Sequence, residues 1–126
     1  SSFQIGLPHM LFLARRYLQA IEAAKQLNDD PYLALSYAEL GHKQEAIAAA
    51  DRAIKTAGSP VVVAQLASVY AKAGKPEKAR AMLGALEAQV RQRYVCGFHV
   101  ACVYSALGDK AKAFAWLEKA YLARSD

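Results

Sequence analysis

The residues of this chain that most resemble a metal site are Cys96, His99 and Cys102, spaced three apart. Residues at this spacing lie on one side of a helix, so two thiolates and an imidazole would face the same way. A rise of about 1.5 Å per residue, however, separates the two cysteines by about 9 Å along the helix axis. Zinc holds each thiolate at about 2.3 Å, and a disulfide needs Cα atoms within about 7 Å. We therefore expect reduced thiols here, with no metal and no disulfide.

The rest of the chain offers no arrangement of residues that is typical of an active site. Its glycines are isolated from one another, so no glycine-rich phosphate loop is present, and no serine lies in a Gly-x-Ser-x-Gly motif. Carboxylates are scattered at helical spacing beside cations, as Glu22 is beside Lys25, which is typical of solvated helix faces. We predict that the protein is not an enzyme and binds no cofactor.

Cations gather between residues 72 and 80, where Glu77 is the only acidic residue. This basic edge, Lys72–Arg80, is either a solvated turn or a surface that attracts an acidic peptide or, less readily, RNA. No aromatic residues are interleaved with the cations, unlike in proteins that bind single-stranded nucleic acid. Nucleic-acid or acidic-partner binding through this edge is therefore the alternative function. Its cations are Lys72, Lys75, Lys78 and Arg80.

Length and composition bound the remaining classes of protein. The chain has 126 residues, of which 55% are hydrophobic, and this suffices for one domain with its own core. The formal net charge of +5 is modest. No apolar run approaches the roughly 20 residues that a membrane-spanning helix needs. We expect a cytoplasmic protein without membrane contact.

One pattern of residues occurs three times along the chain. An apolar residue and an alanine are followed, at fixed intervals, by tyrosine, glycine and a second alanine. The glycines are 33 residues apart and then 34 residues apart. A period of this length in a helical sequence is typical of a solenoid, in which each repeat buries its apolar face on its neighbours. The three copies are Leu33-Ala34, Tyr37, Gly41 and Ala46; Leu66-Ala67, Tyr70, Gly74 and Ala79; and Val100-Ala101, Tyr104, Gly108 and Ala113.

Start and stop signals divide the chain into about seven helices. Asp29 and Ser59 can cap helices that begin with Pro31 and Pro60, because proline is tolerated in the first turn. No segment alternates between apolar and polar residues as a half-buried strand does. We predict an all-α protein with helices at roughly 9–27, 31–40, 43–57, 60–73, 76–91, 94–107 and 110–124.

The recurring small residues, tyrosine and turn glycine resemble the tetratricopeptide repeat between residues 30 and 126. This resemblance implies a right-handed solenoid of antiparallel helix hairpins. The last repeat also resembles the C-terminal repeat segments of bacterial multidomain regulators, which implies a module of a larger bacterial regulatory protein. We divide the chain into a vector-derived or disordered tail (1–9), an N-terminal helix or degenerate repeat (10–27), and repeats at 30–58, 59–92 and 93–126.

The resemblance also implies where a partner would bind, since the first helices of such repeats line a concave groove that holds a peptide. One subset of the family clamps a C-terminal carboxylate with lysine, arginine and asparagine, and this clamp is missing here. The sequence favours instead a helix or a hydrophobic segment of a protein partner, unless the solenoid is too short to close a groove. The implied groove residues are Leu35, Glu39, Gln65, Ser68, Lys72, Phe98, His99, Cys102 and Ser105.

The last predicted helix is unusually apolar for the end of a solenoid, where a polar outer face is expected. This apolar face indicates either a truncated chain or a contact with a second subunit. We favour a homodimer joined two-fold through this helix, because a head-to-tail contact would form open fibres. Met10, Leu11, Phe12 and Leu13 form a second apolar end. The possible interface residues are Phe114, Trp116, Leu117 and Tyr121.

Overall fold

The computed structural model describes residues 7–91 and 97–125. Every regular element in these two ranges is an α-helix, which confirms the all-α prediction. Eight helices are described rather than about seven: α2 (Leu7–Leu13), α3 (Tyr17–Leu27), α4 (Asp30–Glu39), α5 (Lys43–Ile54), α6 (Pro60–Lys72), α7 (Pro76–Arg91), α8 (Gly97–Ala106) and α9 (Lys110–Ser125).

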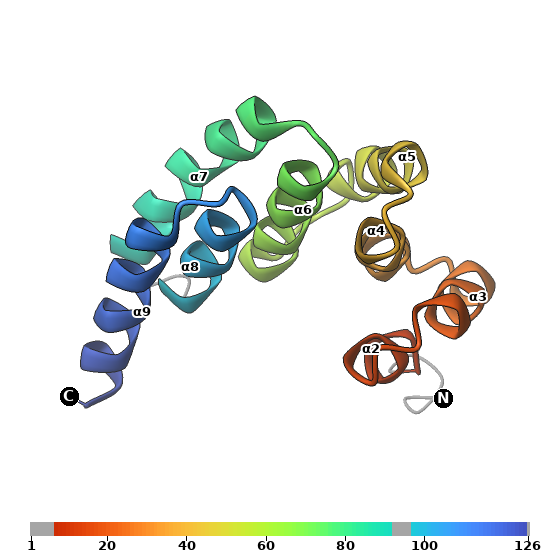
Figure 1. Cartoon of the computed structure of the whole chain (residues 1–126), viewed down its shortest axis with the longest axis horizontal. Coiled ribbons are helices and arrows are strands. Elements are labelled where there is room, and N and C mark those ends of the chain that lie inside the picture. Colours follow the sequence, from red (N-terminus) through yellow and green to blue (C-terminus); the bar gives the residue numbers. More distant parts are fainter. Residues whose placement is uncertain (1–6, 92–96, 126) are drawn as a thin grey trace.

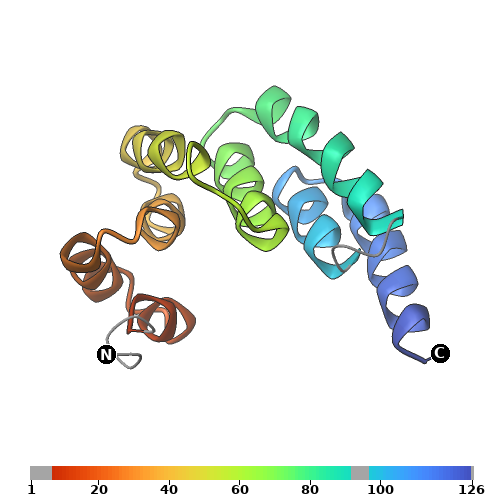
Figure 2. The same cartoon turned by 180° about the vertical axis from the view of Figure 1, so that it is seen from behind.

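The helices pair into successive antiparallel hairpins that stack into an arch (Figure 1). The first helix of each hairpin (α2, α4, α6 and α8) lies on the inner, concave side, and the second (α3, α5, α7 and α9) lies on the outer side, as the view from behind also shows (Figure 2). Within the stack, α3 packs on α4, α5 on α6 and α7 on α8. The helices α2 and α9 therefore lie at opposite ends of the arch.

The predicted helix starts are confirmed by their capping contacts. The Asp29 side chain accepts a hydrogen bond of 3.3 Å from the backbone N–H of Tyr32. Ser59 Oγ accepts one of 3.2 Å from the backbone N–H of Val61. Each cap satisfies one of the N–H groups that a helix leaves without a partner in its first turn.

The predicted continuous helix over residues 9–27 is wrong, because the chain reverses at Arg15. Arg15 has a φ of +60°, and the backbone N–H of Arg16 donates to the carbonyl oxygen of Leu11. Gly41 (φ +80°) makes the equivalent turn in the next hairpin, where the N–H of His42 donates to the carbonyl oxygen of Tyr37. An arginine thus adopts the left-handed conformation that glycine supplies elsewhere.

With Arg15 aligned to the turn glycines, residues 7–27 fall into register with the later repeats. Pro8 and Ala20 then take the positions of Ala34 and Ala46, and all four side chains are buried. The alternative of a degenerate first repeat therefore describes this segment, and residues 7–9, which we assigned to the tail, belong to α2. The step from Arg15 to Gly41 is only 26 residues, which is why the period conceals it.

Alanines at equivalent positions let the helices of each hairpin approach closely. Ala20, Ala46 and Ala79 are completely buried, and Ala113 is nearly so. The large side chains of Leu66, Tyr70, Leu86 and Val100 fill the space between hairpins. The core is therefore a series of interfaces between neighbouring hairpins, as a solenoid requires.

Two of the repeated tyrosines also join successive hairpins by hydrogen bonds. Tyr70 Oη on α6 donates to Asp51 Oδ1 on α5 at 2.7 Å, and Tyr104 Oη on α8 donates to a carboxylate oxygen of Glu87 on α7. Burial and the neighbouring Glu87 carboxylate raise the pKa of Tyr104 to about 12. The pKa of Tyr70 is raised for the same reasons, so both phenols stay protonated at neutral pH.

Candidate partner-binding groove

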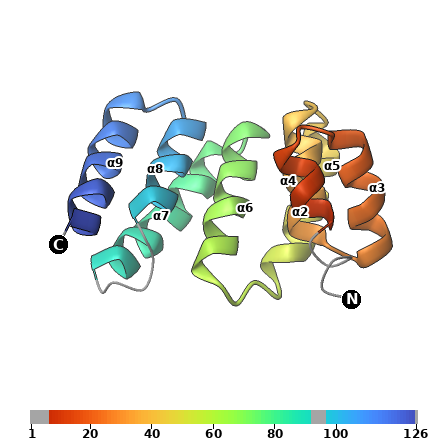
Figure 3. The ribbon, with the colours of Figure 1, turned by 90° about the horizontal axis from the view of Figure 1, so that it is seen from below.

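The concave side of the arch holds a cavity of about 800 Å³, lined by residues of α2, α4, α6 and α8 and of the α2–α3 turn. Figure 3, which views the arch from below, shows these inner helices following one another from one end to the other. All nine residues that we assigned to the groove line this cavity. They are Leu35, Glu39, Gln65, Ser68, Lys72, Phe98, His99, Cys102 and Ser105. The structure thus brings the predicted set together on one surface, while their binding of a partner stays a prediction.

The cavity is built from equivalent positions of the four hairpins. The residues six positions before each turn form one row: His9, Leu35, Ser68 and Cys102. The residues two positions before each turn form a second: Leu13, Glu39, Lys72 and Ala106. The two rows are four residues apart, so they share one face of each inner helix. Register alone therefore explains why these side chains meet.

An ion pair crosses the middle of the groove. Lys72 Nζ on α6 donates to a carboxylate oxygen of Glu39 on α4, two equivalent positions of successive hairpins. Both side chains are partly exposed, so water screens the pair and its contribution to stability is small. Its effect on binding is larger, because the pair leaves the centre of the groove polar but nearly uncharged.

The N-terminal end of the groove is aromatic, and the sequence analysis did not assign these residues to it. The ring centroid of Phe12 lies 5.5 Å from that of Tyr17 and 5.8 Å from that of Tyr32. His9 Nδ1 and the Tyr32 hydroxyl form a hydrogen bond. All four side chains line the cavity. The repeat register of α2 is the signal that could have placed His9 and Phe12 here.

The C-terminal end of the groove carries an exposed phenylalanine and a thiol. Phe98 is 51% exposed, and its ring makes an edge contact with His99, with centroids 5.6 Å apart. Burial raises the pKa of the Cys102 thiol, although the nearby Lys72 acts in the opposite direction. Cys96 lies outside the described residues. Among the residues that the structure describes, no cluster of three or more histidine, cysteine or acidic side chains could hold a metal ion.

Comparison with protein families decides which solenoid this is. The family model described as "Tetratricopeptide repeat" matches residues 33–59 and 98–126, which comprise most of the hairpins α4–α5 and α8–α9. The chain contains a tetratricopeptide repeat domain. Repeats of this kind serve in general as protein–protein interaction modules. Neither the curated proteins nor the solved structures that were compared with the chain gave a match.

None of the helices described in this tetratricopeptide repeat domain is long and apolar enough to cross a membrane.

The basic edge of the tetratricopeptide repeat domain is divided between two surfaces. Lys72 lines the concave groove and pairs with Glu39, whereas Lys78 lies 3.4 Å from Asp51 and 4.4 Å above the centroid of the Tyr70 ring. Two of the four cations are thus neutralised locally. Binding of nucleic acid or an acidic partner by this edge stays a prediction, and no contact in the described residues favours it.

The outer face of α9 carries three of the four possible interface residues. Phe114, Leu117 and Tyr121 are exposed on the last helix of the repeat domain. Trp116 instead points inward, because it packs against the second core and contacts the backbone of α8 at Gly97. Trp116 therefore belongs chiefly to the fold, and the other three residues form the open face.

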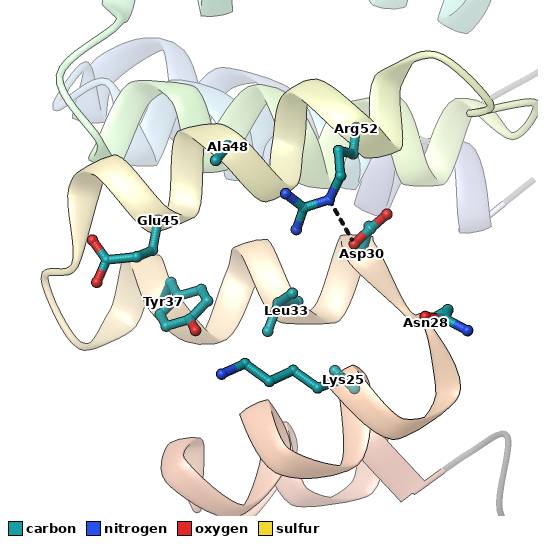
Figure 4. Close-up of a pocket in the computed structure, with 9 residues that line it drawn as sticks. Lys25, Asn28, Asp30, Leu33, Tyr37, Glu45, Ala48 and Arg52 are labelled. Atoms are coloured by element: carbon teal, nitrogen blue, oxygen red, sulfur yellow. Dashed lines mark hydrogen bonds and ion pairs between the residues drawn. The ribbon is translucent and has the colours of Figure 1, made fainter.

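A second cavity, of about 490 Å³, lies among α3, α4 and α5 (Figure 4). Arg52 Nε on α5 donates to Asp30 Oδ1 on α4 at 3.3 Å and closes one side of it. Tyr37 lies inside, with Lys25 Nζ 6.0 Å from the centroid of its ring. Lys25 occupies the position that Asp51 holds in the next hairpin. The Tyr37 hydroxyl consequently lacks the carboxylate that Tyr70 and Tyr104 bind.

Proposed function

We propose that the domain binds a segment of a partner protein in its concave groove. The observation that carries this proposal is the row construction of the cavity, since equivalent positions of four hairpins face one space. Large side chains at both ends of this space remain accessible, among them Leu13 and Phe98. Exposed apolar side chains grouped on a concave surface are typical of binding sites.

The lining favours a helical or hydrophobic segment over a charged tail. The aromatic cluster around Phe12 and Tyr32 offers apolar contacts at one end, and Phe98 offers them at the other. Between them, Lys72 and Glu39 neutralise each other. A partner segment with apolar side chains toward its two ends and polar side chains in its middle would match this order, as an amphipathic helix in a groove does.

A matched pair of phenylalanine variants tests the proposal. Peptides selected from a random library on the immobilised domain would be synthesised with a fluorophore, and their binding followed by anisotropy. Phe98→Ala should weaken binding by about tenfold or more, because a buried aromatic anchor is worth at least about 1–2 kcal/mol. Phe114→Ala, an equally exposed phenylalanine on the outer face of α9, should leave binding unchanged.

Circular dichroism should show both variants as helical as the parent, since neither side chain belongs to the core clusters. If the selected peptides bind both variants and the parent equally well, they bind outside the groove. Loss of helicity in Phe98→Ala alone would show that Phe98 supports the fold instead.

We further propose that the domain serves as a module of a larger bacterial regulatory protein. The support is the resemblance of its last repeat to the C-terminal repeat segments of such regulators. Sequencing the complete gene provides the test, because a signalling or DNA-binding domain encoded in the same reading frame is expected. A reading frame that encodes tetratricopeptide repeats alone would contradict this proposal.

A further inference from the structure

We propose that copies of this protein associate end to end, with α9 of one copy packed on α2 of the next. The reasoning starts from an interface that the molecule contains three times. The second helix of a hairpin packs on the first helix of the following hairpin, as α3 does on α4, α5 on α6 and α7 on α8. Each end of the arch presents one half of this same interface.

The outer face of α9 is the first half. Six and nine residues after the turn glycine, α5 carries Ile47 and Ala50 and α9 carries Phe114 and Leu117. Ala50 is fully buried and Ile47 packs against the first core cluster, where α5 meets α6. Phe114, by contrast, is 73% exposed and Leu117 is also exposed. No described residue covers the face that α5 buries.

The back of α2 is the second half. Five residues before the turn, Ser36, Val69 and Val103 are each completely buried. Met10 takes this position in α2 and is 52% exposed. The positions of α2 that correspond to the buried side of the other inner helices are nevertheless all apolar: Leu7, Met10, Leu11 and Ala14. The helix keeps the composition of a covered surface, although no described hairpin precedes it.

A second copy of the chain is the occupant that satisfies both ends. Terminal repeats of a solenoid need polar outer faces to stay soluble alone, and neither end has one. The two faces lie at opposite ends of the arch (Figure 1), so one molecule cannot join them within itself. A two-fold contact between two α9 helices would leave α2 uncovered, whereas a head-to-tail contact covers both faces and repeats an interface already present.

The association should be visible by light scattering over a range of concentrations. A head-to-tail contact gives linear chains, so the average mass of the parent protein should keep rising with concentration. Met10→Glu on α2 and Phe114→Glu on α9 each place a charge in the contact and should raise its Kd by about tenfold or more. Gln44→Glu adds the same charge on the exposed side of α5 and serves as the control.

Mixing the two variants tests the direction of the contact. Met10→Glu retains an intact α9 face and Phe114→Glu retains an intact α2 face, so each alone should be monomeric. Together they should form one-to-one dimers that grow no further. A parent that is monomeric at high micromolar concentration, self-association of Met10→Glu through α9 alone, or a mixture that stays monomeric would each overturn the proposal. Phe98→Ala should associate like the parent, so this test is independent of the groove.

Discussion

At the scale of single residues, the repeated tyrosines do not all act alike. Tyr70 and Tyr104 donate to carboxylates on the preceding hairpin, and Lys78 and Lys112 lie over their rings, 4.4 and 5.5 Å from the centroids. At Tyr37 the charges are exchanged: the preceding hairpin offers Lys25, and the position of Lys78 is held by Glu45. Two junctions between hairpins therefore have a hydrogen bond that the first junction lacks.

Replacing each tyrosine by phenylalanine measures this difference. Tyr70→Phe and Tyr104→Phe remove a hydrogen bond to a partly exposed carboxylate, so each should lower the free energy of unfolding by about 1 kcal/mol. Tyr37→Phe is the matched control and should change it little, since the ring packing is kept. Urea unfolding followed by circular dichroism provides the comparison. Equal effects at all three positions would mean that the carboxylates contribute nothing.

The same two phenols predict how stability responds to alkaline pH. The ordinary pKa of tyrosine is 10.0, and in the fold the pKa of Tyr104 is raised to about 12. Below pH 10 the phenol is neutral in both states, and the full stabilisation is present. Between about pH 10 and 12 the unfolded chain ionises first, so this stabilisation is lost as pH rises.

Unfolding free energies measured across this range should therefore fall with pH. The fall should be shallower in the double variant Tyr70→Phe with Tyr104→Phe, which also subtracts the effect of lysine deprotonation. Tyrosinate absorbance of the folded parent should show two phenols titrating late. Parallel curves for parent and double variant would contradict the assigned pKa shifts.

At the scale of the helices, the turn residues decide where each hairpin reverses. Gly74 has a φ of +88°, and a methyl group added there would meet no atom within 4 Å, so only the backbone conformation resists substitution. Arg15 holds a similar conformation at φ +60° without being glycine. The conformation costs an L-residue about 1–2 kcal/mol.

Substitutions at these two turns should consequently act in opposite directions. Gly74→Ala should destabilise the domain by about 1 kcal/mol, and Arg15→Gly should stabilise it by about 0.5 kcal/mol, after the added flexibility of the unfolded chain is subtracted. Arg16→Gly is the matched control, because Arg16 has a φ of −97° and no left-handed cost to relieve. Thermal melts would compare the three, and a lower midpoint for Arg15→Gly would contradict the turn assignment.

The first hairpin also shows how far the sequence predicts the fold. The spacing of Tyr37, Gly41 and Ala46 recurs twice, and the helices that it predicts are confirmed. The hairpin α2–α3 was missed because Arg15 replaces the glycine and its step to Gly41 is seven residues shorter than the step from Gly41 to Gly74. Its buried Ala20, in register with Ala46, was the remaining signal.

The groove was predictable to the same extent, because its residues follow from repeat register. The resemblance assigned nine residues that the structure places around one cavity, up to Ser105 on α8. It did not assign the aromatic end formed by Phe12, Tyr17 and Tyr32, since two of these belong to the missed hairpin. The pairing of Lys72 with Glu39 joins residues 33 apart and depends on how the hairpins stack.

At the scale of the whole molecule, the arch separates two apolar surfaces with different proposed partners. The groove is lined by the inner helices, and Phe98 is its most exposed aromatic side chain for which the structure gives a value. The ends of the arch expose Met10 and Phe114, which lie outside the groove lining. Because the surfaces share no residue, a partner could bind the groove of every copy in an end-to-end chain.

The most direct test of the groove uses the Cys102 thiol, which is exposed and lies in its lining. Its rate of alkylation by N-ethylmaleimide would be followed by peptide mass spectrometry, which separates it from Cys96. A cysteine introduced by Ala48→Cys on the outer side of α5 provides the control. With a saturating library-selected peptide, alkylation of Cys102 should slow in proportion to occupancy while that of the control cysteine is unchanged. An unchanged rate at Cys102 with the peptide fully bound would contradict the proposal that the groove holds the partner.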